Sequence, residues 1–118
     1  MTLIMNYYKN FKAGQELILA TVDRKGRPHA NVVISLGFID SKLLVADCQM
    51  ETTIKNLQTN RRICVIGNYI RIKGTVQIFT AGKYFDYAVE HSQGYQVRHA
   101  ILITPKKVFD LDNYKKIL

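Results

Sequence analysis

The segment Ala46–Gly67, ADCQMETTIKNLQTNRRICVIG, decides the fold, because the spacing of its apolar residues changes twice. It begins at the end of a strand-like apolar run and continues with Met50, Ile54 and Leu57 at the helical spacing i, i+4, i+7. It ends in a second strand-like run, RICVI. The segment therefore predicts a short helix over residues 51–60, inserted between two β-strands.

The residues that precede this helix predict a meander of antiparallel strands. Three runs rich in β-branched and apolar residues are separated by turn residues. The runs are Leu17–Val22, Asn31–Ile39 and Leu43–Ala46, and the turns are Asp23–Pro28 and Asp40–Lys42. Apolar residues at helical spacing also predict a first helix over residues 2–13, which Gly14 ends.

The residues that follow predict a long hairpin, a third helix and a last strand. Gly74 inside the hairpin indicates a bulge or a close approach of another group. The hairpin strands are Arg62–Ile66 and Tyr69–Thr80, joined by Gly67–Asn68. The third helix is predicted from four residues that share a helical face: Tyr84, Tyr87, Ala88 and His91. The last strand covers His99–Thr104 and resumes after Pro105 at Val108–Leu111.

Composition indicates one folded domain over residues 1–118, since 47% of the residues are hydrophobic and 22% are charged. A chain of this length can bury one core. With mostly hairpin-compatible connections, the elements predict a mainly β protein with helices, a small antiparallel barrel of about six strands.

The sequence predicts a cytoplasmic protein that does not associate with membranes. No basic segment precedes the short apolar run of Met1–Asn6, and no stretch approaches the roughly 18 apolar residues of a membrane span. Cys48 and Cys64 lack CxxC spacing and are too few for a disulfide framework. A reducing compartment is therefore expected.

The chain is strongly basic, with a formal net charge of +8. Such a surface attracts nucleic acid, phosphorylated cofactors or acidic membranes. The basic residues occur as scattered pairs, Arg61–Arg62, Lys106–Lys107 and Lys115–Lys116, without a longer run. The charge is thus equally consistent with a surface that only keeps the protein soluble.

Three short sequences within Leu17–Thr104, ATVDRKGRPHANVV, LLVAD and TTIKNLQTNRRICVI, resemble the FMN-binding split-barrel family. That family includes pyridoxamine 5'-phosphate oxidase and a small stand-alone FMN-binding protein. The resemblance implies a six-stranded antiparallel split β-barrel of the FMN-binding type. It also implies a homodimer that holds FMN in the groove between its subunits.

In this family the helix over 51–60 begins at the FMN phosphate. The first turn of any helix has N–H groups without intrahelical partners and a partial positive charge, which suit a phosphate, and Thr52 and Thr53 add hydroxyl donors. Alternatively, a threonine there only caps the helix. Relatives often carry a basic residue at these positions; here Lys55 or Lys73 would supply the charge.

The resemblance places the FMN ring along Val32, Val33 and Ile34, although a strand of this kind also fits a core position. It places Asp47, Cys48 and Gln49 near the polar pyrimidine edge of the ring. Cys48 has no adjacent base and is assigned no catalytic role. No catalytic residue is assigned elsewhere, and the spacing of His29, His91 and His99 predicts no metal site.

The predicted function is that of an FMN-binding flavoprotein, a flavin-dependent oxidoreductase or electron carrier. It is not expected to be pyridoxamine 5'-phosphate oxidase itself, because adjacent Arg98 and His99 do not reproduce that enzyme's arginine and histidine separated by one residue. Tyr84, Phe85 and Tyr87 are expected either on the dimer surface or on the packed face of their helix.

Two other classes of function remain open. Similar split barrels bind the deazaflavin F420 or heme, and the missing basic phosphate ligands favour these cofactors. A basic nucleic-acid-binding barrel is a weaker alternative, because aromatic residues are not interleaved with lysine and arginine on one strand.

Overall fold

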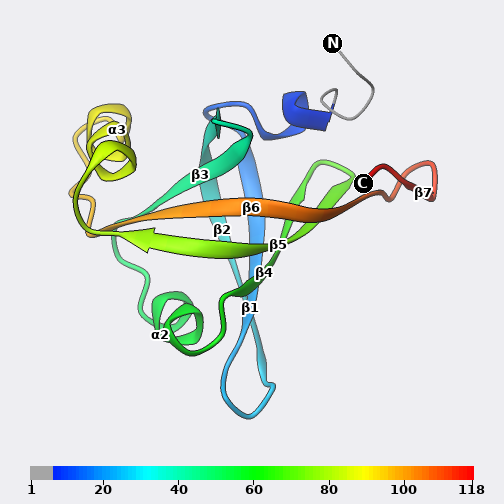
Figure 1. Cartoon of the computed structure of the whole chain (residues 1–118), viewed down its shortest axis with the longest axis horizontal. Coiled ribbons are helices and arrows are strands. Elements are labelled where there is room, and N and C mark those ends of the chain that lie inside the picture. Colours follow the sequence, from blue (N-terminus) through cyan, green and yellow to red (C-terminus); the bar gives the residue numbers. More distant parts are fainter. Residues whose placement is uncertain (1–6) are drawn as a thin grey trace.

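Six antiparallel strands close into a barrel in the computed structural model, which describes residues 7–118 (Figure 1). The elements are η1 (Tyr7–Phe11), β1 (Glu16–Val22), β2 (Pro28–Ile39), β3 (Lys42–Asp47), α2 (Thr52–Thr59), β4 (Arg62–Gly67), β5 (Ile70–Phe79), α3 (Lys83–His91), β6 (His99–Asp110) and β7 (Lys115–Lys116). The strand order is β3-β2-β1-β4-β5-β6-β7, and a β3–β6 pairing closes the barrel. The predicted six-stranded antiparallel barrel is confirmed.

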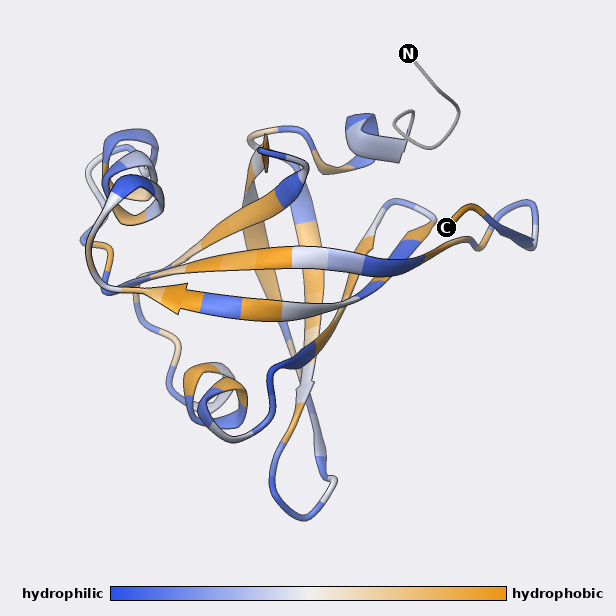
Figure 2. Ribbon diagram, in the orientation of Figure 1, coloured by the Kyte–Doolittle hydropathy of each residue, from blue (hydrophilic) through white to orange (hydrophobic). Residues whose placement is uncertain are grey.

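The barrel interior is filled by the alternate apolar residues of its strands. Leu17 and Leu19 of β1, for example, are buried, while Ile18 between them is exposed. Figure 2 shows hydrophobic residues concentrated along the strands and hydrophilic residues at the hairpin tips. Phe11 of η1 and Leu57 of α2 belong to the same buried cluster, so both elements cover the barrel core.

The predicted first helix differs from the structure. Its described part is a five-residue 3-10 helix, Tyr7–Phe11, rather than an α-helix, and residues 2–6 lie outside the described residues. The segment is rich in aromatic residues, which have modest α-helix propensity, and a single tight turn is enough to bury Tyr7 and Phe11. Gly14 does end this region, with a φ of 92°.

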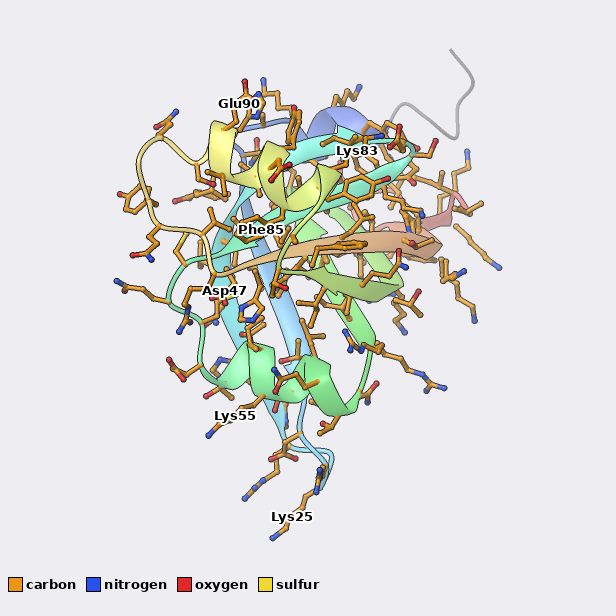
Figure 3. All side chains as sticks on the ribbon, turned by 60° about the vertical axis from the view of Figure 1, so that its left-hand side comes forward. Lys25, Asp47, Lys55, Lys83, Phe85 and Glu90 are labelled. Carbon is orange, nitrogen blue, oxygen red and sulfur yellow. The ribbon has the colours of Figure 1, made fainter. Side chains whose placement is uncertain are left out.

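Helix α3 covers a second, smaller apolar cluster on the outer side of the barrel. Ala88 packs there with Leu44 of β3 and Leu102 of β6. Tyr84, Phe85 and Tyr87 are partly buried against this cluster, and Figure 3 shows Phe85 directed from α3 toward the sheet. These aromatics therefore form the packed face of their helix. Within residues 7–118, no helix combines the length and hydropathy needed to cross a membrane.

The barrel is split along one side of β2. All of β1 pairs with the first half of β2, from Pro28 to Ile34, whereas β3 pairs with β2 only from Ser35 onward. The reason is that β3 ends at Asp47, where the chain turns toward α2. Within residues 7–118, no strand pairs with the half of β2 from Pro28 to Ile34 on that side, so its main-chain donors and acceptors are left free there.

Gly74 marks both a bulge and a close approach, as its position in the sequence predicted. The β5–β6 register shifts between Lys73 and Gly74, and a Cβ atom at Gly74 would overlap the carbonyl oxygen of Thr104. The predicted interruption at Pro105 is not found, because β6 runs continuously from His99 to Asp110. The bulge beside Gly74 accommodates the proline within the strand.

Candidate cofactor site at the start of α2

Helix α2 begins without a side-chain cap. Glu51 occupies the N-cap position, and its carboxylate makes no capping hydrogen bond. The first intrahelical bond runs from the Lys55 amide to the Glu51 carbonyl, so the amides before Lys55 precede the helical ladder. This turn therefore keeps its partial positive charge and its unpaired donors, and the N-cap role considered for the threonines is not observed.

The two adjacent threonines lie in different environments. Thr52 is exposed, whereas Thr53 is fully buried and its hydroxyl accepts a hydrogen bond of 2.8 Å from the Asn31 amide of β2. One turn later, buried Asn56 donates to the Thr21 hydroxyl of β1 at 3.0 Å. These two bonds hold α2 against the β1–β2 hairpin, so Thr53 positions the helix and Thr52 is the threonine available to a ligand.

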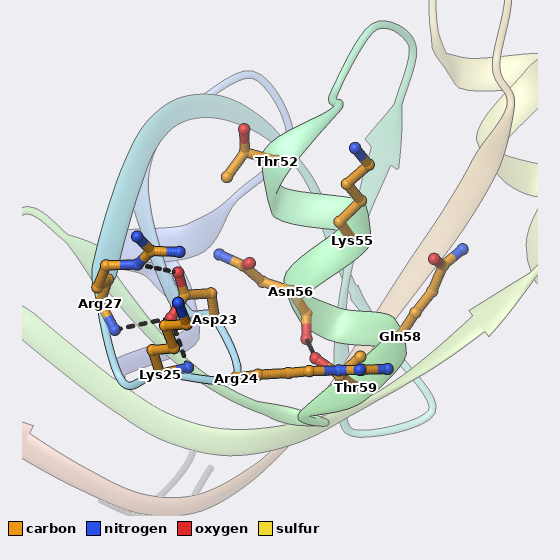
Figure 4. Close-up of a pocket in the computed structure, with 9 residues that line it drawn as sticks. All are labelled: Asp23, Arg24, Lys25, Arg27, Thr52, Lys55, Asn56, Gln58 and Thr59. Carbon is orange, nitrogen blue, oxygen red and sulfur yellow. Dashed lines mark hydrogen bonds and ion pairs between the residues drawn. The ribbon is translucent and has the colours of Figure 1, made fainter.

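A groove of about 520 Å³ separates α2 from the tip of the β1–β2 hairpin (Figure 4). Its lining is polar and basic. The residues are Thr52, Lys55, Asn56, Gln58 and Thr59 from α2, and Asp23, Arg24, Lys25 and Arg27 from the hairpin. Figure 3 places Lys55 on the outer side of α2 and Lys25 at the hairpin tip.

The single carboxylate of this groove is already paired. Asp23 accepts hydrogen bonds from the Lys25 and Arg27 amides at 2.8 and 2.9 Å and from the Arg27 side chain at 2.6 Å. The hydrogen bonds from Arg27 hold the pKa of Asp23 below its usual range, so the carboxylate stays charged at neutral pH. Lys55, Arg24 and Lys25 then leave the groove with net positive charge.

The three ring-site residues predicted on β2 do not share one face. Val32 and Ile34 are 66% and 50% exposed, whereas the Val33 side chain is buried in the barrel core. All three belong to the stretch of β2 that lacks a strand on one side. Because neighbouring Asn31 bonds to Thr53, this free edge lies next to the start of α2.

Asp47, which the resemblance places near the pyrimidine edge of the ring, is fully buried, and its carboxylate is occupied by hydrogen bonds within the protein. Its carboxylate accepts hydrogen bonds from the Met50 amide at 2.6 Å, from Arg98 at 3.2 Å and from His99 Nδ1 at 2.5 Å. Arg98 also donates to the Met50 carbonyl at 2.8 Å. The residues just before α2 are thereby tied to Arg98 and to His99 of β6.

The remaining predicted residues are separated from one another. Gln49 is exposed, and Cys48 is half-buried beside Asp47, where burial and that carboxylate raise the pKa of the thiol. Lys73 lies in a second groove, formed by β1, β4, β5 and β6, and does not line the groove that contains Thr52 and Lys55. The structure thus unites Thr52 and Lys55 and sets Lys73 apart.

Sequence reasoning missed Asn31, Arg98 and His99 as neighbours of the site. Asn31 carries one detectable signal: it is a polar residue two positions before the inward-facing Val33, and so on the same face of the strand. Arg98 and His99 reach Asp47 across about fifty intervening residues. Nothing local in the sequence predicts that contact.

Comparisons with known proteins agree with the resemblance inferred from the sequence. The model of the family described as pyridoxamine 5'-phosphate oxidase matches residues 7–112. No curated protein matches the chain.

Solved structures that share the fold carry different functional names. HupZ of Group A Streptococcus is 22% identical with a TM-score of 0.82, and the match covers 98% of each chain. An FMN-binding protein of Syntrophomonas wolfei is 14% identical with a TM-score of 0.76, covering 90% of this chain and 84% of that one. HutZ of Vibrio cholerae, a heme storage protein, is 14% identical with a TM-score of 0.65, covering 93% and 95%. An F420 reductase also matches.

Proposed function

Because this chain belongs to the pyridoxamine 5'-phosphate oxidase family, we propose that it is an FMN-binding flavoprotein that serves as an oxidoreductase or electron carrier. One observation carries this proposal: the uncapped start of α2 lies beside the unpaired half of β2. Phosphate donors and a polar, partly apolar ring site are thus adjacent within one chain.

The phosphate would lie at the first turn of α2. Its oxygens would accept hydrogen bonds from the uncapped amides and from the Thr52 hydroxyl. Lys55, on the same groove, supplies the positive charge. Thr53 contributes indirectly, because its bond to Asn31 sets the position of the helix.

The ring would lie along β2. The free edge of the strand offers main-chain donors and acceptors to the ring nitrogens and oxygens, and exposed Val32 and Ile34 offer apolar contact. When bound, FMN supplies the redox chemistry, accepting hydride or electrons on its own ring. The role of the chain is to bind, orient and shield this group.

A second copy of the chain would complete the shield. Val32, Ile18 and Ile66 are direct cross-strand neighbours and form an apolar row over β2, β1 and β4. Val32 and Ile18 are 66% and 47% exposed, so the row forms a contiguous exposed apolar patch, which is a feature of interaction surfaces. Self-association over this row gives a homodimer with the ring at its margin.

Pyridoxamine 5'-phosphate oxidation is not part of the proposal. Arg98 and His99 are both engaged by buried Asp47, and Arg98 also pairs with Glu51 at 3.3 Å. These side chains hold the start of α2 in place. They are therefore not offered to a substrate as a pair.

The test is an FMN titration followed by absorption and fluorescence quenching. Wild-type protein should bind FMN, and Thr52→Glu should weaken binding at least tenfold, because it places an anion against the phosphate. Gln58→Glu is the matched control, since it adds the same charge to the same groove away from the helix start. Equal affinities in both variants, or no binding by the wild type, would contradict the proposal.

Heme is the second candidate, and one contact favours it. His99 donates through Nδ1 to buried Asp47, an arrangement that typically orients a histidine whose other nitrogen binds a metal. Thr52 and Thr53 also occupy the positions where the resemblance to the family implies a basic residue. A Soret band that shifts in His99→Gln would select heme, and a single deazaflavin band would select F420.

A further inference from the structure

The outer surface of the barrel carries a second groove, distinct from the one at α2. It has a volume of about 560 Å³ and lies where β1, β4, β5 and β6 run side by side. The groove is lined by Ala20, Thr21, Val22, Pro28, Asn60, Arg62, Ile63, Cys64, Lys73, Gly74, Thr75, Lys106 and Lys107. Its volume falls in the range of small-molecule sites, roughly 300–1,000 Å³.

Positive charge is concentrated in this groove without compensation. Four of its lining residues are basic and none is acidic. Lys73 lies directly opposite Lys107 in the β5–β6 register, an arrangement of like charges that destabilises a sheet. Among residues 7–118, neither of these lysines, nor Arg62 or Lys106, makes an ion pair with a carboxylate. An anion bound between them would remove the repulsion.

The backbone is adapted to bring these charges together. Gly74 pairs with Pro105 and Lys73 with Lys107, so Lys106 is the extra residue of a β-bulge. Because a bulge re-aims the side chains beside it, two consecutive lysines line the same groove. Gly74 permits this geometry, since any side chain there would collide with the Thr104 carbonyl.

The floor of the groove is apolar and uncharged. Ala20 and Cys64 are cross-strand neighbours on β1 and β4, and Val22 and Pro28 lie at the β1–β2 end. Burial raises the pKa of the Cys64 thiol, so it adds no negative charge beneath the lysines. A ligand that fits this groove combines a flat or apolar body with more than one negative charge.

We propose that this groove binds a small organic phosphate with at least two negative charges, of about the size of a mononucleotide. The ring of such a ligand would rest on the floor at Ala20 and Cys64, and its phosphates would lie between Lys73 and Lys107. None of the residues that line this groove lines the groove at α2. A small ligand is favoured over a nucleic-acid strand because the unpaired charges gather in one groove of limited volume.

The experiment uses ADP as the probe, titrated into the full-length protein by calorimetry at low salt. Wild-type protein should bind ADP, and the double variant Lys73→Gln/Lys107→Gln should raise the Kd about tenfold or more. The matched control is Lys115→Gln/Lys116→Gln, which removes the same charge from exposed β7 outside the groove and should change the Kd less than about twofold. Circular dichroism verifies that both double variants are folded.

Three results would overturn the inference. The first is no ADP binding by the wild type at about 1 mM, and the second is an equal loss of ADP affinity in both double variants. The third is that single-stranded oligothymidylate binds more tightly than ADP, with an affinity that grows with its length and depends on Lys73 and Lys107. FMN titration of the same proteins separates the two proposals. Unchanged FMN affinity in the Lys73→Gln/Lys107→Gln variant supports two independent sites. Loss of both FMN and ADP binding in that variant would show one shared site and contradict the inference. Failure of the wild type and both double variants to bind FMN would contradict only the proposed function.

Discussion

The two grooves that border the β1–β2 hairpin are similar in volume and in basic character, yet they are built differently. The groove at α2 combines a few cations with the uncapped amides of a helix, and its one carboxylate is already paired. The groove on β4–β6 relies on side-chain cations alone, brought together by a bulge. Positive charge thus attracts anions to both, but only main-chain donors at α2 offer fixed hydrogen-bond geometry to a phosphate.

Gly74→Ala should have the largest effect and should damage only the groove on β4–β6. The new Cβ atom would collide with the Thr104 carbonyl, so the β5–β6 pairing must shift, at a cost of about 3 kcal/mol in the free energy of unfolding. Chemical denaturation measures this loss, and ADP titration measures the groove. A variant as stable as wild type would show that the bulge is not tightly constrained.

Asp47→Asn should weaken the groove at α2 instead. The substitution removes the buried charge that Arg98, His99 and the Met50 amide share, which should cost about 2–3 kcal/mol in the free energy of unfolding. It should also lower FMN affinity by loosening the start of α2. Glu51→Gln is the control: it affects only an exposed contact of Arg98 and should cost less than about 0.5 kcal/mol.

Asn31→Ala should have a smaller effect at the same groove. It leaves the buried Thr53 hydroxyl without its donor and should cost about 1–2 kcal/mol in the free energy of unfolding. FMN affinity should fall while ADP affinity stays unchanged, because Asn31 does not line the second groove. A fall in ADP affinity as well would show that the two grooves respond as one unit.

Asp40→Asn should have the smallest effect and should leave both grooves intact. Asp40 accepts hydrogen bonds from Lys83 and Tyr84, at 2.6 and 2.8 Å, and these contacts hold its pKa below the usual range. The carboxylate therefore stabilises the fold at neutral pH, and this contribution is lost as the pH falls through its lowered pKa. The difference in melting temperature between wild type and variant should disappear in that acidic range. A difference that persists at still lower pH would contradict this account.

Much of the architecture follows from local pattern. The change of apolar spacing around Ile54 predicted α2 between two strands, and alternation predicted β1 and β4 within a residue or two of their observed bounds. Gly74, a glycine inside a strand pattern, predicted the bulge found in the β5–β6 register. The first helix was predicted less well, because a short aromatic segment fits a 3-10 turn and an α-helix equally.

The candidate site followed from local pattern only in part. Thr52 and Lys55 were predicted together and lie together, because both belong to one helix. Thr53 and Lys73 had been assigned to the same phosphate, yet one is buried against Asn31 and the other lies in the second groove. Their environments depend on strands that meet only after the barrel closes.

By itself, the sequence determined which segments are strands and helices, the family to which the chain belongs, and the basic character of its surface. Those properties depend on residue type and on spacing within a few residues. The tertiary structure alone decided that Asp47 holds Arg98 and His99, and that Lys73 faces Lys107 across a bulge. Such contacts join residues far apart in the chain, and they are set by the strand register that barrel closure imposes.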